Sequence, residues 1–183
     1  MRLRAHLTIS QNSIVSASFQ ISSPQQSEDH ILFTHTGTTH KKGVIKMPAC
    51  LCGTWDIVSN VNMEGYMIAL GISPCLRKVA LKLKLRKVIE LQGDQLIIKT
   101  LSILRNYTLS FRVGQEFEEF TQGLDKRHVK SLVTWEGNKL ACEQVGEKKS
   151  RGWTHWIEDN KLHLELHCEG QVCKQVFKKN VPE

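Results

Sequence analysis

Two tryptophans and a histidine within four residues mark the part of this chain that is best suited to hold a ligand. The segment reads Arg151-Gly-Trp-Thr-His-Trp-Ile-Glu158. Because alternate side chains of a β-strand face opposite sides, Trp153, His155 and Ile157 share one face. A single imidazole on an apolar face is typical of a small-molecule pocket. Taken alone, the pattern also fits a core histidine satisfied by a neighbour or water, with Trp153 as ordinary packing.

Two other segments are predicted to turn polar side chains inward. In residues 105–112, the alternating set that contains Arg105 and Tyr107 also holds a leucine and a phenylalanine, so this set is the inner one. Lysine prefers water, and a lysine precedes Gln175 on the opposite face, so Gln175 is expected to face inward. A packed core holds such groups only when partners, water or a ligand satisfy them, which favours an interior cavity.

The order of the elements predicts a closed sheet. An apolar strand over residues 53–58 precedes two short helices, the first over 63–70 and the second beginning at Ser73-Pro74. From residue 87 onward, turn signals recur about every ten residues, which indicates about nine more antiparallel strands. Such a sheet exposes its edges unless it closes. We therefore expect an all-β fold, a ten-stranded antiparallel up-and-down β-barrel capped by a helix-turn-helix lid.

Composition limits the class of protein. The 183 residues are 40% hydrophobic and 23% charged, with a formal net charge of +7 and six cysteines. No run approaches the ~18 apolar residues of a membrane helix, and no apolar segment follows the basic start as it does in a secretory signal. We expect a cytoplasmic protein with reduced thiols, and the mild, dispersed charge does not favour nucleic acid as a partner.

The chain divides into two parts of different composition. Residues 1–46 are rich in Ser, Thr, Gln and His and lack an amphipathic period. We interpret them as an N-terminal extension that is either disordered or an artefact of the gene model. Residues 47–183 carry the regular patterns and are predicted to form one β-barrel domain, which we expect to be a monomer.

Neither catalysis nor metal binding is favoured by the spacing of reactive residues. The chain has no nucleophile elbow, no HExxH motif and no phosphate-binding loop, so we expect that the protein is not an enzyme. Cys50-x-Cys52, His167-Cys168 and Cys173 could meet if the first and last strands were neighbours, but their spacing is not that of a zinc finger or ribbon. We expect no bound metal and no cofactor.

Several segments together resemble the intracellular lipid-binding proteins, the family of the fatty-acid-binding proteins. They are Gly53-Thr-Trp, the predicted helix pair, Arg105-Asn-Tyr, Val113-Gly-Gln-Glu-Phe-Glu-Glu119, Leu132-Val-Thr-Trp135, Arg151-Gly-Trp-Thr-His-Trp and Val172-Cys-Lys-Gln-Val-Phe-Lys178. Within this family the chain resembles the cellular retinol-binding proteins. His155 stands where types I and II have Gln, which indicates the type IV branch, with type III next. The resemblance covers about residues 48–180 and implies a β-clam with a helical lid.

The resemblance implies roles in retinol binding for ten residues. His155 would hydrogen-bond the retinol hydroxyl, and Lys87 would lie near that hydroxyl along the polyene. Trp153 would contact the polyene chain of the ligand. Gln175 would lie near the polar end of the ligand. The resemblance also implies an interior polar network of Thr100, Arg105 and Tyr107, and portal or lid positions at Tyr66, Ala80 and Leu104.

This chain departs from the family pattern at three places. Met63 replaces the usual Phe, Leu85-Arg86 replaces the usual Pro-Asp, and Cys50-x-Cys52 is unusual at the start of the first strand. The second change lies directly before Lys87 and affects the loop that presents this lysine. On spacing alone, Lys87 would be an ordinary surface lysine at a strand start.

The function implied by the resemblance is that of an intracellular carrier, which binds all-trans-retinol in the barrel cavity and delivers it to membranes or retinoid-metabolising enzymes. Binders of fatty acids and retinoic acid in this family typically have Arg at the position of His155, because a buried carboxylate needs cationic donors. Imidazole and carboxamide suit a neutral alcohol instead. Two alternatives remain open: a fatty-acid or other lipid carrier of the same fold, and a non-carrier adaptor that uses the basic lid and the N-terminal tail.

The predicted lid carries five basic residues, Arg77, Lys78, Lys82, Lys84 and Arg86. Their simplest interpretation is a solvated helix face. The functional alternative is transient contact with anionic membranes or with retinoid enzymes during ligand transfer. The end of the second helix stays open, because residues 80–85 also alternate like a strand.

Overall fold

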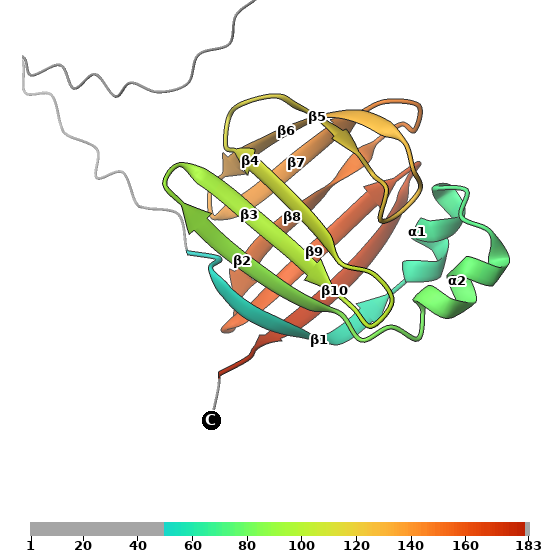
Figure 1. The fold of residues 1–183 in the computed structure, drawn as a ribbon, viewed down its shortest axis with the longest axis horizontal. Coiled ribbons are helices and arrows are strands. Elements are labelled where there is room, and N and C mark those ends of the chain that lie inside the picture. Colours follow the sequence, from blue (N-terminus) through green and yellow to red (C-terminus); the bar gives the residue numbers. More distant parts are fainter. Residues whose placement is uncertain (1–49, 182–183) are drawn as a thin grey trace, which may run out of the picture. The chain divides into compact units, whose positions relative to one another are not determined.

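The computed structural model describes residues 50–181, which contain ten β-strands and two short helices (Figure 1). In chain order the elements are β1 (Gly53–Val61), α1 (Met63–Ala69), α2 (Pro74–Ala80), β2 (Arg86–Gln92), β3 (Gln95–Leu101), β4 (Tyr107–Arg112), β5 (Phe117–Phe120), β6 (His128–Glu136), β7 (Lys139–Val145), β8 (Arg151–Glu158), β9 (Lys161–Cys168) and β10 (Gln171–Lys179). The predicted ten strands and helix pair are confirmed. The predicted extension, residues 1–46, lies outside the described residues.

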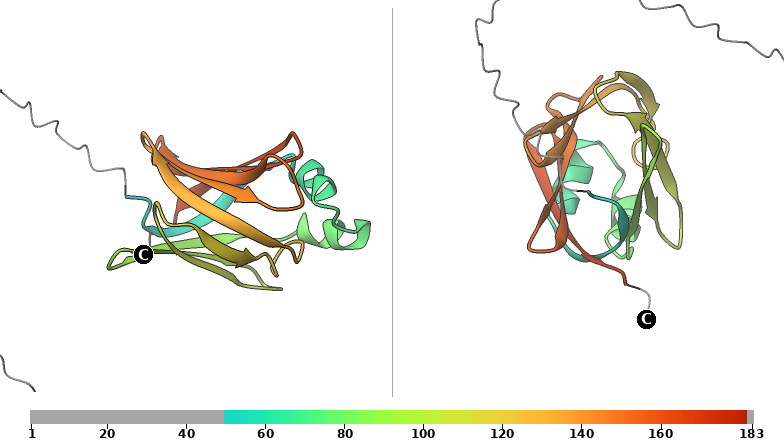
Figure 2. Two further views of the ribbon diagram at one scale, coloured as in Figure 1. Left: turned by 90° about the horizontal axis from the view of Figure 1, so that it is seen from above. Right: turned by 90° about the vertical axis from the view of Figure 1, so that its left-hand side faces the viewer.

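The ten strands form one antiparallel sheet that curves back on itself. Consecutive strands are neighbours, and β1 pairs with β10, so the order runs β4-β3-β2-β1-β10-β9-β8-β7-β6-β5. Figures 1 and 2 show the strands wrapping around a common interior, with both helices at one end. The sheet therefore forms a barrel with one opening in its hydrogen-bond ladder, between β4 and β5.

Within the described residues, neither helix is long and apolar enough to cross a membrane.

Side chains bridge the opening between β4 and β5. The rings of Phe111 and Phe117 stack with their centroids 5.7 Å apart. The hydroxyl of Tyr107 donates a hydrogen bond to the carboxylate of Glu119. Aromatic stacking and a charge-assisted hydrogen bond thus replace the backbone ladder here. The predicted closure is achieved by side chains at this point and by backbone pairing elsewhere.

Strand alternation decides which side chains face the interior. On β6, buried and exposed residues alternate strictly from His128 to Val133. On β10, Cys173, Gln175 and Phe177 are buried, as predicted, while Lys174 is exposed. The main apolar cluster joins both halves of the sheet and includes Trp55, Ile89, Phe111, Val133, Leu140, Leu162 and Phe177.

The two helices differ in how firmly they are packed. Tyr66 of α1 and Leu70, which follows α1, pack against Cys168 of β9 and Cys173 of β10. None of the seven residues of α2 is buried. Gly71 ends the α1 turn, because this glycine has a φ of 79°, which other residues rarely adopt. The second helix ends at Ala80, and residues 81–85 form neither helix nor strand.

Asn62 directly precedes α1, but it does not cap the helix with its side chain. Instead its amide Nδ2 donates a hydrogen bond of 2.9 Å to the carbonyl of Val172 on β10. The residue adopts a left-handed conformation, with φ at 58°, which asparagine tolerates better than most residues. Asn62 therefore ties the start of the helix pair to the sheet.

Candidate ligand-binding cavity

An internal cavity of about 580 Å³ is lined by strands and by both helices. This volume lies within the range of small-molecule pockets, about 300–1,000 Å³. Its apolar wall includes Leu76 and Val79 from α2 and Ile98, Leu109, Leu164 and Leu166 from strands. All ten residues singled out from the sequence line it, namely Tyr66, Ala80, Lys87, Thr100, Leu104, Arg105, Tyr107, Trp153, His155 and Gln175. The fold therefore brings together residues that are up to 109 positions apart in the sequence (Tyr66 to Gln175).

His155 is a buried imidazole on the cavity wall. The side chain is 3% exposed, and neither ring nitrogen has a hydrogen-bond partner among residues 50–181. Burial, with a smaller effect from the charge of Lys87, holds the pKa of His155 well below its usual value. The ring is therefore neutral at pH 7 and carries one N–H donor and one acceptor. Buried polar groups are normally satisfied, so this imidazole is a candidate for a ligand contact.

Lys87 is a buried ammonium with a single protein acceptor in the described structure. Its Nζ donates to the Thr100 hydroxyl at 3.0 Å and lies 5.7 Å from the ring centroid of Phe177. Burial lowers the pKa of Lys87 to about 8. An ammonium has three N–H donors, so Lys87 can donate to a ligand without losing Thr100. The Leu85-Arg86 change before it does not turn this lysine out of the barrel.

Gln175 and Trp153 complete this polar corner of the cavity. Gln175 Nε2 donates to Asn60 Oδ1 at 3.2 Å, and the side chain is 3% exposed. The Trp153 ring meets the His155 ring edge-on, with their centroids 4.9 Å apart. Because Trp153 and His155 are two residues apart on β8, they face the same interior, as the alternation predicted. We refer to His155, Lys87 and Gln175 as the open corner.

The three residues expected to form one interior network occupy three different places. Thr100 accepts from Lys87, and Tyr107 joins Glu119. Arg105 is exposed, and its Nη1 donates to the carbonyl of Gln122 at 2.8 Å. The prediction that Arg105 belongs to an interior network is wrong, because Arg105 precedes β4 and alternation does not hold in the loop. It lines the cavity from its rim.

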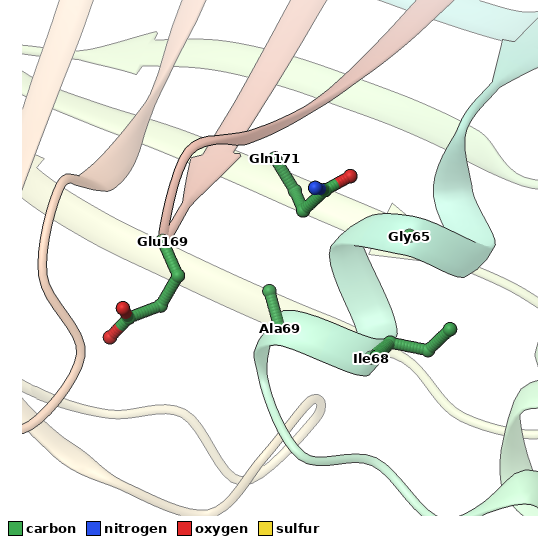
Figure 3. A pocket seen from close by; sticks show the side chains of 5 residues that line it. All are labelled: Gly65, Ile68, Ala69, Glu169 and Gln171. Atoms are coloured by element: carbon green, nitrogen blue, oxygen red, sulfur yellow. The ribbon is translucent and has the colours of Figure 1, made fainter.

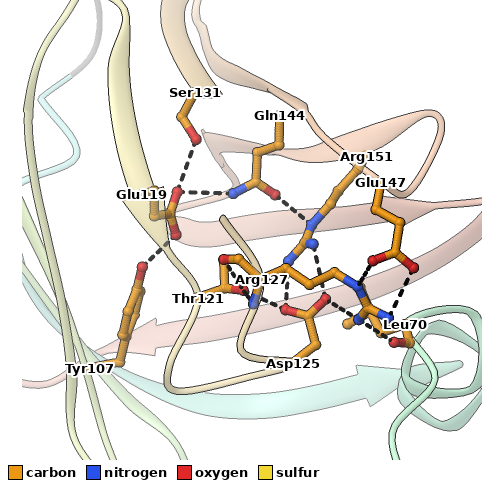
Figure 4. Close-up of polar contacts among 10 residues, drawn as sticks. All are labelled: Leu70, Tyr107, Glu119, Thr121, Asp125, Arg127, Ser131, Gln144, Glu147 and Arg151. Carbon is orange, nitrogen blue, oxygen red and sulfur yellow. Dashed lines mark hydrogen bonds and ion pairs between the residues drawn. The ribbon is translucent and has the colours of Figure 1, made fainter. Parts of the chain in front are cut away.

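A second polar cluster lies on β4 to β8 and in the loop after β5 (Figure 4). The Glu119 carboxylate accepts hydrogen bonds from Tyr107, from Ser131 at 3.0 Å and from Gln144 at 3.0 Å. Gln144 Oε1 in turn accepts from Arg151 Nε at 3.2 Å. Burial and the hydrogen bond to Glu119 raise the pKa of Tyr107. The whole set is a chain of satisfied groups.

The cluster continues into a buried ion pair. Two guanidinium nitrogens of Arg151 each lie 2.9 Å from an oxygen of Asp125, and both side chains are 1% exposed. Arg127 also bonds Asp125, at 2.9 Å, and donates to the carbonyl of Leu70, which follows α1, at 2.8 Å. Burial raises the pKa of Asp125, but hydrogen bonds from Arg151, Thr121 and Arg127 outweigh it and lower the pKa. This cluster joins the helical lid to the sheet, and we call it the saturated network.

The sequence analysis missed most of the saturated network. Alternation from Trp153 places Arg151 on the inner face of β8, so this arginine could have been found. Asp125 and Arg127 lie in a loop, where no periodic signal exists. Glu119 lies in the acidic segment Glu116-Phe-Glu-Glu119, and its burial depends on the packing of β5 against the gap. Only the fold brings these charges together.

A second depression lies outside the barrel, between α1 and the turn after β9. It is lined by Gly65, Ile68 and Ala69 of α1 and by Glu169 and Gln171, and Figure 3 shows the side chain of Ala69 pointing toward Gln171. It is open to solvent, and no buried, unpaired polar atom among the described residues points into it. Within residues 50–181, no group of three His, Cys, Asp or Glu side chains is placed to hold a metal ion. The internal cavity is therefore the better candidate site.

Comparison with known proteins places the fold in a family. The pattern of the lipocalin / cytosolic fatty-acid binding protein family matches residues 52–180. Retinoid-binding protein 7 of Mus musculus is 60% identical over 133 residues, which are 73% of this chain and 99% of that protein. Retinol-binding protein 1 of Bos taurus is 52% identical over 133 residues, 73% of this chain and 98% of that protein.

Solved structures agree with this assignment. Human cRBP IV is 59% identical, with a TM-score of 0.71 over 73% of this chain and all of that one. The REP1-NXSQ fatty acid transporter is 31% identical, with a TM-score of 0.68 over 73% of this chain and 98% of that one. The resemblance seen in the sequence is confirmed. The chain belongs to the lipocalin / cytosolic fatty-acid binding protein family.

Proposed function

We propose that this protein is an intracellular carrier that binds one molecule of all-trans-retinol in the barrel cavity. The observation that carries the proposal is the buried, neutral imidazole of His155, whose two nitrogens have no partner among the described residues. A hydroxyl group can donate to the unprotonated imidazole nitrogen or accept from the protonated one. The relatives named for retinoid or retinol binding, at 52–60% identity, support the same ligand class.

The open corner supports a neutral alcohol better than a carboxylate. A buried carboxylate needs cationic donors, and the neutral imidazole of His155 is not one. Arg151 is already engaged by Asp125 and Gln144. Lys87 is the one cation of the open corner, but burial lowers its pKa. Its N–H groups would donate to the hydroxyl of Thr100 and to the hydroxyl of the ligand. Apolar burial of the polyene would supply most of the affinity, at about 25 cal/mol per Å².

The ligand would pass between α2 and the loop after β3. Leu76, Val79 and Ala80 of α2 and Leu104 of that loop line the cavity, and Leu76 and Leu104 are about 60% exposed. Because α2 buries none of its residues, it can move at little cost in packing. We infer that opening of this portal controls ligand access.

Delivery would use the exposed lysines beside the portal. Two of the five predicted lid cations are engaged, since Arg77 donates to the carbonyl of Ile72 and Arg86 pairs with Asp56. Lys78, Lys82 and Lys84 are exposed. We infer that these three contact anionic membranes or retinoid enzymes transiently, in the cytoplasm and as a monomer.

A titration of the full-length protein with all-trans-retinol tests the proposal. Retinol should quench tryptophan emission, because Trp153 lines the cavity. The quenching should saturate at one ligand per chain. Oleate in excess should not displace the retinol. His155→Gln, which keeps a donor and an acceptor, should bind retinol nearly as well as the parent, and His155→Leu should not.

Each other outcome of this titration is informative. Displacement by oleate would replace retinol with a fatty acid as the ligand, with Lys87 as its counter-ion. Absence of binding by both ligands would leave the adaptor hypothesis. That hypothesis predicts salt-sensitive binding to polyanions that does not depend on His155.

A further inference from the structure

The segment that leads into β1 carries two thiols that the cavity does not use. Cys50 is exposed, and Cys52 is half-buried. Neither lines the cavity. Of the other cysteines, Cys75 stands on α2, and the remaining three are buried. Cys50 and Cys52 are thus the two cysteines of the described chain that are both close in sequence and open to a reagent.

Packing holds the two thiols on one side of the chain. Leu51, between them, is 2% exposed and belongs to the main apolar cluster. Its carbonyl accepts a hydrogen bond of 3.0 Å from the indole nitrogen of Trp55. Because side chains of an extended segment alternate, burial of Leu51 turns Cys50 and Cys52 outward together. Cys50 lies close enough to Cys52 to raise the pKa of the Cys52 thiol.

The two thiols differ in what surrounds them. Cys50 is exposed, so a dissolved reagent meets it first. Burial raises the pKa of the Cys52 thiol, and the neighbouring Cys50 raises it further. Backbone hydrogen bonds at Cys52 and Leu91 act in the opposite direction and favour the Cys52 thiolate. This arrangement is that of an attacking thiol beside a second thiol that can resolve the product.

We propose that Cys50 and Cys52 form a thiol–disulfide exchange site for low-molecular-weight disulfides of the glutathione class. The Cys50 thiolate attacks one sulfur of the disulfide, which forms a mixed disulfide and releases one thiol. The Cys52 thiolate then attacks the Cys50 sulfur, which closes the Cys50–Cys52 bond and releases the second thiol. The protein loses two protons and two electrons, and both electrons reduce the small disulfide to two thiols.

The spacing makes this bond a reversible one. Residues i and i+2 of an extended chain have Cα atoms about 6.6 Å apart. Disulfides span about 4.4–6.8 Å, so the bond would form at the long end of the range. Strained disulfides are the readily reduced ones. Because Leu51 anchors the segment to the core, closure would pull on this anchor and on the Trp55 hydrogen bond.

The test uses the full-length protein with Cys75→Ser as the background, since Cys75 would also react. The protein is incubated with glutathione disulfide, and the peptide that contains residues 50–52 is analysed by mass spectrometry. We expect the loss of two hydrogens from this peptide, and full reversal by reduced glutathione. Cys52→Ser should stop at the mixed disulfide, which should persist at least about tenfold longer than in the background protein. Cys50→Ser should react at least about tenfold more slowly.

Other outcomes overturn the proposal. Two glutathione adducts on one peptide would show that the thiols react independently. Equal lifetimes of the mixed disulfide in the background protein and in Cys52→Ser would exclude a resolving role for Cys52. Tryptophan emission of each variant, measured beforehand, shows whether it is folded, because Trp55 lies beside the site. Retinol binding is measured separately, so failure of the carrier proposal leaves this test unaffected.

Discussion

The cavity has two polar regions that differ in how completely their groups are paired. In the saturated network, Glu119 accepts from three side chains, and Asp125 is held by two arginines. In the open corner, His155 has no partner among the described residues, and Lys87 has one. Unpaired buried groups destabilise a fold, whereas a completed network resists the removal of any member. The difference assigns stability to the first region and ligand recognition to the second.

The largest effect is expected from Asp125→Ala, which leaves two arginines without their shared carboxylate. Breaking a buried ion pair destabilises by about 3–5 kcal/mol, a large part of the total stability of a domain. Urea unfolding checks the value. Asp94→Ala is the control, because Asp94 pairs with Arg112 at the surface, where such pairs contribute about 0–1 kcal/mol. Equal losses of stability in Asp125→Ala and Asp94→Ala would show that the saturated network stabilises the fold no more than a surface ion pair does.

The pH dependence of the saturated network follows from the same carboxylate. The pKa of Asp125 is lowered in the folded state, so its contribution is complete above the unfolded pKa, about 3.9. It is lost as the pH falls from there toward the folded pKa. The parent protein should therefore lose stability in this acidic window more steeply than Asp125→Ala, as measured by urea unfolding at several pH values. Parallel curves would show that other carboxylates govern the acid transition.

The second effect is on binding. His155→Leu should weaken retinol affinity by about 1.5–3 kcal/mol, or roughly tenfold to a hundredfold, because the hydroxyl would be buried without a partner. Stability should not fall, since the parent imidazole has no protein partner in the described residues. His128→Ala, at an exposed position, is the control. Unchanged retinol affinity in His155→Leu would show that the hydroxyl lies elsewhere.

A third effect concerns Lys87, the charged member of the open corner. Its folded pKa, about 8, lies below the unfolded value of about 10.4, so the unfolded state binds more protons between these values. Stability of the parent should therefore rise as the pH increases from about 8 to about 10. Lys87→Met should be more stable at pH 7, on the order of 1–3 kcal/mol, and should lack this rise. A lower stability of Lys87→Met at pH 7, seen by urea unfolding, would show that its hydrogen bond outweighs its burial.

The smallest effect is expected at the portal. Leu104→Ala should change the rate of retinol association about twofold to threefold with little change in affinity, because Leu104 lines the rim and is mostly exposed. Stopped-flow tryptophan quenching measures this rate. Ile103→Ala is the matched control, since Ile103 is 92% exposed and does not line the cavity. Equal rates in both variants would move the portal away from this loop.

Much of the open corner could be predicted from strand periodicity. Trp153 and His155 alternate on β8, and Gln175 alternates with exposed lysine on β10. Alternation failed at Arg105, which lies in a loop and turns to Gln122. It could not foresee that His155 lacks a partner, because that depends on what the opposite strands present. The family resemblance supplied the ligand class, which periodicity does not contain.

The sequence by itself determined the ten strands, the helix pair and the inner faces of β4, β8 and β10, because turn residues and the two-residue period are local signals. Only the tertiary structure decided which polar groups are paired. Asp125 and Arg127 lie in the loop between β5 and β6, whereas Arg151 lies on β8, and their ion pairs form only after β5 to β8 fold around the loop. The same folding leaves His155 unpaired, since its neighbours across β7 and β9 are Leu140 and Leu164.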